Sequence, residues 1–359
     1  MKRIEFYDRE NETKEIRDIL DSEPSLITFV YGPINSGKTT LVTHLVDQLP
    51  EDHKVFYINL RGRFIRNYDD FIKVLFDVEH VARYEQIKEF LKPIAAVLPE
   101  SYNGIPIPKD TFLKLFKEKE IEDAFVYIET VLRAFYESGR VPVLIIDELQ
   151  VIGDMKIDGY LIYKLFNFFV RLTKELHLAH VFVMTSDSLF LEQVYSEAML
   201  KGRCDYLLVD DFDYERTMGF LDGYGFDDQE REMIWQNVGG KPVSLVKLIN
   251  AKVSGKKIED VLRSMLMLRT GEIKQRIGVL TIVSKKVLFE GEEIELKYDR
   301  VKEILDKFSE ERSYAYEIIT PEIAYLVREN ILFSDPVKCI IKPQSQLDLL
   351  ALREVLKSV

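Results

Sequence analysis

The chain contains few of the residues that build disulfide-bonded or metal-centred proteins. Two of its 359 residues are cysteines and five are histidines. Cys204 and Cys339 have no paired spacing, which excludes a disulfide framework or a cysteine zinc site and favours a reduced, cytoplasmic setting. The histidines show no metal-ligand spacing. No apolar run approaches the roughly 20 residues of a membrane span, and residues 1–10 lack the apolar core of a signal peptide. We therefore expect no membrane association.

Basic side chains are outnumbered by acidic ones. Lys and Arg number 49 against 61 Asp and Glu, so the formal net charge is −12. This balance argues against a protein that coats nucleic acid or anionic membrane with its whole surface, although a local basic patch is still allowed. Hydrophobic residues, in contrast, make up 47% of the chain. That content supports a large core, and the length suggests two or three domains.

The first 210 residues alternate strand-like and helix-like runs, which is typical of a mostly parallel α/β sheet. A helix is predicted directly after the first strand, at 39–48. The long interval 61–140 is largely helical in pattern and reads as an insertion. It is interrupted at 99–108 by a loop, because closely spaced prolines and a glycine disfavour helix there. Strands are predicted at 26–31, 54–60, 143–146, 180–185 and 205–209.

Beyond residue 211 the pattern becomes helical, with predicted helices at 214–223, 227–237 and 243–252. Gly239-Gly240 would close the second of these, and Pro242 suits the first turn of the third. The last part of the chain reads as three helices followed by two short strands, the order of a winged helix-turn-helix. We therefore expect a P-loop ATPase core at 1–211, a helical lid at 212–272 and a winged-helix domain at 273–359.

One motif carries most of the functional information. The segment at 32–39 fits G-x-x-x-x-G-K-[ST] without a mismatch, between a predicted strand and a predicted helix. Its glycines let backbone N–H groups face phosphate, and the following helix adds its positive end. Lys38 would lie against the β- and γ-phosphates, and the Thr39 hydroxyl would occupy a Mg²⁺ position. The predicted nucleotide contacts are Gly32, Pro33, Ile34, Asn35, Ser36, Gly37, Lys38, Thr39 and Thr40.

A buried strand that ends in two acids, Asp147 and Glu148, supplies the second half of such a site. Asp147 would support the Mg²⁺ shell through a water. Glu148 would orient or deprotonate the water that attacks the γ-phosphate. The plainer alternative is a strand that ends in solvated carboxylates. Beside an intact phosphate loop, the pair favours a nucleotide hydrolase over a small-molecule kinase.

Two further positions are open to two interpretations each. The strand at 180–185 is followed by Ser186 and Asp187, and a hydroxyl of Thr185 or Ser186 could sense the γ-phosphate. Alternatively, Ser186 or Asp187 caps a helix. Arg203 precedes the fifth strand and could act as an arginine finger, in its own site or on a neighbouring subunit. Otherwise it is a surface arginine or part of a structural salt bridge.

With these residues assembled, the chain resembles the archaeal ATPase family, within the STAND branch of AAA+-like P-loop ATPases. The likeness spans nearly the whole chain. It lies in an F-x-x-R-E-x-E segment at 6–12, the Walker A loop, the Asp147-Glu148 Walker B pair, Arg203 and the lid motif at 239–242. It also lies in a tail at 329–333 and 341–344, which is similar to the family's winged helix.

This resemblance implies several contacts that the residue pattern alone does not give. Phe6 and Arg9 would lie near the adenine of ATP, and Pro242 would contact the nucleotide from the lid. The phosphate-loop strand would be central, with the sensor strand between it and the Walker B strand. The preference for ATP or ADP over GTP also comes from the resemblance.

The predicted winged helix is a poor DNA reader by charge. Its recognition helix would be 322–330, with one arginine against two glutamates. Residues 276–359 hold 13 basic and 15 acidic side chains, whereas phosphate contacts need Lys and Arg in number. A protein-contact or autoinhibitory role is favoured. The stretch 241–274 has 8 basic and 3 acidic residues, which a solvated helical face explains more simply than nucleic-acid contact.

The sequence therefore predicts an ATP-binding, Mg²⁺-dependent ATPase of low intrinsic turnover that acts as a molecular switch. Its nucleotide state would set the positions of the lid and the winged helix and so signal to an unknown protein partner. An oligomer is possible, since Arg203 could act in trans. The alternative is an ATP-regulated DNA-binding protein similar to archaeal replication initiators. In a third possibility, Glu148 is poorly placed and the chain binds nucleotide without useful turnover.

Overall fold

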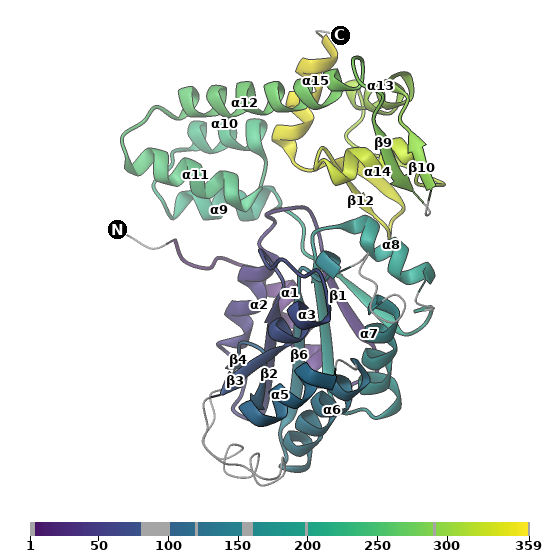
Figure 1. Cartoon of the computed structure of the whole chain (residues 1–359). Coiled ribbons are helices and arrows are strands. Elements are labelled where there is room, and N and C mark those ends of the chain that lie inside the picture. The colour runs from purple at the N-terminus through teal and green to yellow at the C-terminus, as the bar shows by residue number, and fades with distance from the viewer. Residues whose placement is uncertain are drawn as a thin grey trace.

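The computed structural model describes residues 4–79, 101–118, 121–152, 161–197, 200–289 and 292–357. Figure 1 shows an α/β core in the lower half of the view, a group of helices at upper left and a mixed C-terminal domain at upper right. The long helix α12 (Ile258–Val279) crosses from the helical group to the C-terminal domain. Among the described helices, none combines the length and apolar content that crossing a membrane requires.

The core is built on a parallel sheet with the strand order β4-β2-β6-β7-β1-β8. Every strand pair in it is parallel, so the carboxyl ends of the strands meet at one edge. The expected position of the sensor strand is confirmed, since β7 lies between β1 and β6; β1, expected to be central, instead lies beside the edge strand β8. The strands are β1 (Ile27–Tyr31), β2 (His53–Asn59), β4 (Ser101–Tyr102), β6 (Val141–Asp147), β7 (His180–Thr185) and β8 (Cys204–Leu208).

Alternate residues of the strands pack into two separate hydrophobic cores, one on each face of the sheet. On one face Val30, Val143 and Met184 are buried against α1 (Glu10–Leu20) and α2 (Lys38–Val46). The opposite face carries the larger, aromatic core, in which Phe29 and Phe56 are buried. Burial on both faces explains why the strands read as continuous apolar runs. The helices of the second face are α3 (Tyr68–Leu75), α6 (Ile121–Glu137), α7 (Leu161–Val170), its π-helical extension Arg171–Glu175, and α8 (Ser188–Glu197).

The predicted loop at 99–108 is wrong in part. Residues 99 and 100 lie outside the described residues, but Ser101–Tyr102 form β4 and Ile105–Pro108 form β5. β5 pairs in parallel with β3 (Phe76–Glu79) in a separate two-stranded sheet. A strand with a single neighbour tolerates proline, because the missing N–H can face away from the partner. Helix α5 (Lys109–Glu118) follows directly.

The helical group contains α9 (Tyr214–Asp222), α10 (Asp228–Val238) and α11 (Pro242–Val253), close to the predicted bounds. Gly239 ends α10 with φ 63°, and Pro242 stands in the first turn of α11. α12 (Ile258–Val279) then joins two hydrophobic clusters. Its first half buries Leu262 in the cluster of the helical group, and its second half buries Ile277 in that of the C-terminal domain.

The C-terminal domain contains the two predicted short strands, as β12 (Leu332–Asp335) and β13 (Ile340–Pro343). It also contains a β9–β10 hairpin and a final helix that the pattern did not predict. β10 reads Glu-Glu-Ile-Glu and has only one apolar residue, so it gives no strand signal. The remaining elements are β9 (Lys286–Phe289), β10 (Glu292–Glu295), α13 (Tyr298–Asp306), the 3₁₀ turn Lys307–Ser309, β11 (Tyr314–Ala315), α14 (Pro321–Arg328) and α15 (Gln346–Lys357).

Two histidines are buried near the amino-terminal edge of the core sheet. His53 begins β2 and His180 begins β7, and each has a buried Nε2 atom with no hydrogen-bond partner within the described residues. Burial, and then the neighbouring His53, lower the pKa of His180 from 6.5 to about 4. Between these two pH values the unfolded chain therefore binds a proton that the folded chain does not.

We expect the free energy of unfolding to fall as the pH drops from 6.5 to 4, since the stability contributed by neutral His180 is lost in this window. A shift of this size corresponds to about 3 kcal/mol. Replacing His180→Phe should flatten the pH dependence measured by urea unfolding. His44→Gln, which changes a partly exposed ring, should retain it. Equal slopes for wild type and His180→Phe would contradict the assignment.

Candidate nucleotide-binding and catalytic site

The loop between β1 and α2 is shaped to bind an anion. Gly32, Asn35 and Gly37 have φ values of 153°, 60° and 96°, and this alternation turns successive peptide groups toward a common centre. A Cβ atom on Gly32 would lie 2.2 Å from the carbonyl oxygen of Val209, so only glycine fits there. α2 begins at Lys38 and directs its positive end into the same space.

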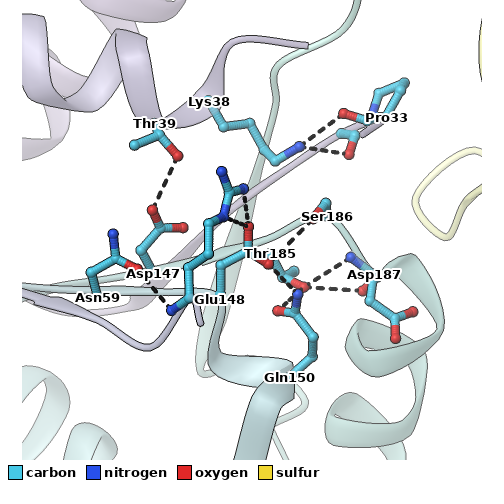
Figure 2. Close-up of polar contacts among 12 residues, drawn as sticks. Pro33, Lys38, Thr39, Asn59, Asp147, Glu148, Gln150, Thr185, Ser186 and Asp187 are labelled. Carbon is cyan, nitrogen blue, oxygen red and sulfur yellow. Dashed lines mark hydrogen bonds and ion pairs between the residues drawn. The ribbon is translucent and has the colours of Figure 1, made fainter. Parts of the chain in front are cut away.

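Positive charge converges on this loop. Lys38 is buried, and its ammonium donates to the carbonyl oxygens of Gly32 and Pro33, each at 2.9 Å (Figure 2). The pKa of Lys38 is lowered to about 8, mainly by burial; the nearby Glu148 carboxylate acts to raise it and the nearby Lys241 ammonium to lower it. The hydroxyl of Ser36 is buried within the loop and has no hydrogen-bond partner among the described residues. The loop therefore offers both charge and an unused donor to a phosphate.

The predicted metal-binding residues lie next to each other at the edge of the sheet. Thr39 Oγ1 donates to Asp147 Oδ2 at 3.0 Å (Figure 2). Asp147 Oδ2 also accepts a 2.7 Å hydrogen bond from Tyr57, whose hydroxyl pKa is raised by burial and by this bond. Hydroxyl and carboxylate oxygens are ligands that suit Mg²⁺. The geometry thus fits a Mg²⁺ held by Thr39, Asp147 and phosphate oxygens, with Tyr57 orienting the carboxylate.

Glu148, the predicted water-activating residue, is held by several donors. Its Oε1 accepts from Arg61 Nε at 3.1 Å and also from the terminal nitrogen of Arg61. Its Oε2 accepts from Gln150 and, at 3.4 Å, from Ser186 Oγ. The Glu148 backbone is left-handed, with φ 61°, and its N–H donates to Met184 O at 3.0 Å. The carboxylate is therefore fixed in position and paired with a guanidinium group.

The two predicted sensor hydroxyls join this network. Thr185 Oγ1 donates to Gln150 Oε1 at 2.8 Å and accepts from the Asp187 N–H at 3.0 Å (Figure 2). Asp187 is the residue that caps α8. Its carboxylate accepts hydrogen bonds from the N–H groups of Leu189 and Phe190 in the first turn of this helix. Ser186 does not cap the helix and bonds to Glu148 instead, so the predicted sensing role of a hydroxyl remains a prediction.

The contacts implied by the family resemblance surround the loop. Arg9 is buried, donates to Ser36 O at 2.7 Å and lies 4.7 Å from the ring centroid of Phe212. Phe6 stacks on His44 of α2, with ring centroids 3.9 Å apart. Pro242 approaches Gly37: a Cβ atom there would lie 4.0 Å from the proline Cγ. Thr40 is exposed on α2.

Arg203 does not join the site of its own chain. It immediately precedes β8, and Cys204 pairs with Ile27 at the start of β1, whereas the phosphate loop follows the other end of β1. Arg203 therefore lies at the opposite edge of the sheet. A finger role in cis does not fit this placement, and a role in trans remains a prediction that requires a second copy.

Residues from the other two domains also contact the loop, which local motifs did not predict. Lys241, from the helical group, donates to Ile34 O at 2.8 Å and to Asp211 Oδ1 at 3.2 Å. Gln344, from the C-terminal domain, accepts from the Ile34 N–H at 3.1 Å. Lys241 lies in the lid motif at 239–242, and Gln344 lies in the tail segment at 341–344. Their contacts with Ile34 span 207 and 310 residues of sequence, and contacts this distant leave no local sequence signal.

Further contacts dock the C-terminal domain beside the loop. The hydroxyl of Tyr31, the last residue of β1, donates to Asp335 at 2.9 Å within the interior. Lys342 forms an ion pair with Asp210 at 2.5 Å. Phe333 joins the aromatic core of the sheet. The phosphate loop is therefore covered by groups from the helical group and from the C-terminal domain.

Together, an anion-shaped glycine loop, a buried lysine, a threonine–aspartate pair and a fixed glutamate define a P-loop nucleotide-binding protein. A family model of an ATPase domain found predominantly in Archaea matches residues 6–248. A second, for the C-terminal domain of MJ1010-like uncharacterized ATP-binding proteins, matches residues 259–356. The chain belongs to this archaeal ATPase family, and it is an ATP-binding protein.

Relatives resemble the chain over its whole length. One uncharacterized ATP-binding protein of Pyrococcus abyssi is 44% identical over 351 residues, 98% of each chain. Another, from Methanocaldococcus jannaschii, is 43% identical over 365 residues, 99% of this chain and 98% of the relative. The solved structure of a Walker-type ATPase of Pyrococcus abyssi covers 97% of this chain and 96% of its own, with a TM-score of 0.62 and 17% identity. That last likeness supports the fold.

The lowered pKa of Lys38 predicts a pH-dependent affinity for ATP. Bound phosphate would stabilise the protonated ammonium, so binding at pH 8 or above should take up a proton. We expect the affinity to fall about tenfold between pH 7 and pH 9, because the lysine must be protonated to bind. Isothermal titration in two buffers of different ionisation enthalpy measures the proton uptake directly.

Lys38→Arg is the control, since a guanidinium group stays protonated throughout this range. Its affinity should be nearly independent of pH, whatever its absolute value, and its binding should take up no proton. Proton uptake of the same size in both proteins would assign the proton to another group.

Proposed function

We propose that the protein hydrolyses ATP and acts as a molecular switch, with nucleotide state read by the helical group and the C-terminal domain. The observation that carries this proposal is the double contact on Ile34. Its carbonyl oxygen accepts from Lys241 at 2.8 Å, and its N–H donates to Gln344 at 3.1 Å. Any change in the phosphate loop on nucleotide binding would therefore alter a contact with each of the other two domains.

In the proposed hydrolysis, Lys38, the N–H groups of the loop and the hydroxyl of Ser36 bind the phosphates. Mg²⁺, when bound, would neutralise developing charge on the β- and γ-phosphates. Thr39 and Asp147 would hold it, with Tyr57 fixing the orientation of Asp147. Glu148 would accept a proton from a water molecule while the oxygen of that water bonds to the γ-phosphorus. The bond between the γ-phosphorus and the oxygen of the leaving ADP breaks in the same step. Pairing with Arg61 restrains Glu148, which supports a low intrinsic turnover.

The DNA-binding alternative finds less support. Its recognition helix corresponds to α14, in which Glu322, Ile323, Ala324, Tyr325, Leu326 and Val327 are all buried. A recognition helix needs free side chains to reach base edges in the major groove. In this conformation the C-terminal domain uses α14 for packing, which favours a role in contact with the ATPase core.

Glu148→Gln tests hydrolysis. Steady-state phosphate release with Mg²⁺ and ATP should fall by about 100-fold or more, the usual contribution of a general base, while ATP binding persists. Glu175→Gln is the matched control, because this exposed glutamate only pairs with Arg171 on its own helix. Equal and negligible rates in wild type and Glu148→Gln would mean that the protein binds ATP without turnover.

Gln344→Ala tests the coupling between domains. Removing this amide frees the Ile34 N–H for phosphate, so the affinity for a fluorescent ATP analogue should rise roughly two- to tenfold, the range for a single hydrogen bond. Small-angle X-ray scattering should also show a more open molecule. Gln275→Ala, at an exposed glutamine of α12, is the control. Unchanged affinity and shape in Gln344→Ala would remove the C-terminal domain from the switch.

A further inference from the structure

One surface beside Glu148 has no role in the function proposed so far. We call residues 61–66, Arg-Gly-Arg-Phe-Ile-Arg, the arginine loop. It follows β2 and therefore lies at the same edge of the parallel sheet as the phosphate loop. It ends where Asn67 caps α3, accepting from the Asp70 N–H at 3.0 Å. The loop is thus anchored at both ends.

The three arginines and Phe64 of the arginine loop are exposed, whereas Ile65 packs against the core of the sheet. Phe64 is 84% exposed, and the guanidinium group of Arg66 lies 5.8 Å from its ring centroid. Arg63 is exposed, and no ion pair is found for it in the described part of the chain. Among the described residues, Phe64 is the most exposed aromatic side chain. The loop therefore presents one free ring face among three guanidinium groups.

Charge and ring chemistry together indicate the partner. The arginine loop carries three positive charges and no acid in a chain of net charge −12. The nearest acids in sequence, Asp69 and Asp70, begin α3, and Asp70 also accepts from the backbone N–H of Arg66 at 3.2 Å. Arginine binds phosphate in a bidentate manner, and an exposed aromatic ring stacks on unpaired bases. A single-stranded nucleic acid satisfies both, whereas a duplex keeps its bases stacked inside.

The loop is also connected to the chemistry. Arg61 is its first residue, its side chain is 62% exposed, and it is the guanidinium group that pairs with Glu148. A phosphate bound at this surface would compete with the Glu148 carboxylate for Arg61. Occupation of the loop would thus release Glu148 to accept a proton from water.

We propose that the arginine loop binds single-stranded nucleic acid, and that binding withdraws Arg61 from Glu148 and so accelerates ATP hydrolysis. The binding surface stands on the exposed ring and the charges alone. The acceleration rests on the proposed function, because it requires Glu148 to act as the base.

Binding is measured first, without ATP, by fluorescence anisotropy of labelled 12-residue oligodeoxythymidylate and oligouridylate on the full-length protein. We expect one or both to bind at low salt. A plot of the logarithm of the association constant against the logarithm of the salt concentration should have a slope of about −2 for three phosphate contacts. In the Arg63→Gln/Arg66→Gln variant, which retains one contact, the slope should be about −0.7. Phe64→Ala should weaken binding about five- to 150-fold, as loss of one stacked base does.

Two controls separate this surface from others. Tyr136→Ala removes an exposed aromatic ring from α6, and Lys256→Gln/Lys257→Gln removes charge from the basic stretch at 241–274. Both should bind the oligonucleotides as wild type does. If the wild type does not bind the oligonucleotides at low salt, the arginine loop is not a binding surface. Equal losses of affinity in the Phe64 and Lys256/Lys257 variants would also overturn this assignment. Binding of polyglutamate in place of the oligonucleotides would assign it to an acidic protein instead.

Coupling is measured next, as phosphate release with and without a bound oligonucleotide. The oligonucleotide should accelerate wild type. Arg61→Gln should be fast without it and respond no further, and Phe64→Ala should keep the basal rate but lose the response. Binding that depends on Phe64 without acceleration would overturn the coupling. Absence of hydrolysis in every protein, with binding intact, would overturn the proposed function and leave the surface standing.

Discussion

The backbone of Ile34 contacts all three parts of the molecule. A backbone carbonyl and N–H each need a hydrogen-bond partner, and in this loop both partners come from outside the core. Lys241 binds the carbonyl from the helical group, and Gln344 accepts from the N–H as part of the C-terminal domain. A phosphate would need the same N–H groups, so nucleotide binding and domain contact draw on a shared set of donors.

The two outer contacts are mechanically linked. α12 is buried in the helical group at Met265 and in the C-terminal domain at Ile273. Between these points Arg269 donates to Asp348 at 2.6 Å and to Asn330 O at 2.7 Å. Because Asp348 also bonds to Ser345, next to Gln344, α12 connects the Lys241 contact with the Gln344 contact. The helical group and the C-terminal domain are therefore connected through α12, so the proposed opening of the site would involve both.

The sequence predicted those parts of the site that are continuous in the chain. The phosphate loop and the strand that ends in Asp147 followed from local patterns, because each needs only a glycine, a periodicity or a charge at fixed spacing. The expected order of the core strands came from the family resemblance. Arg61 and Gln344 could not be found in this way. Their roles depend on which strand ends adjoin in the sheet and on where a distant domain docks. For Arg203 the residue type suited an arginine finger, but its position did not. In the parallel sheet it lies at the amino-terminal ends of the strands, away from the phosphate loop at the carboxyl ends.

The site is thus restrained on two sides by interactions that differ in their exposure to solvent. On the phosphate side, the Tyr31–Asp335 contact is buried and the Gln344–Ile34 contact is partly buried, and breaking them leaves polar groups to be rehydrated or paired again. On the water side, the Arg61 guanidinium is 62% exposed, whereas the Glu148 side chain that it pairs with is only 12% exposed. Water or a competing anion can therefore reach Arg61, while Gln150 and Ser186 still donate to the Glu148 carboxylate. In the proposed function, the water-side restraint would suit exchange with a partner, and the phosphate-side restraint would suit a change that moves whole domains.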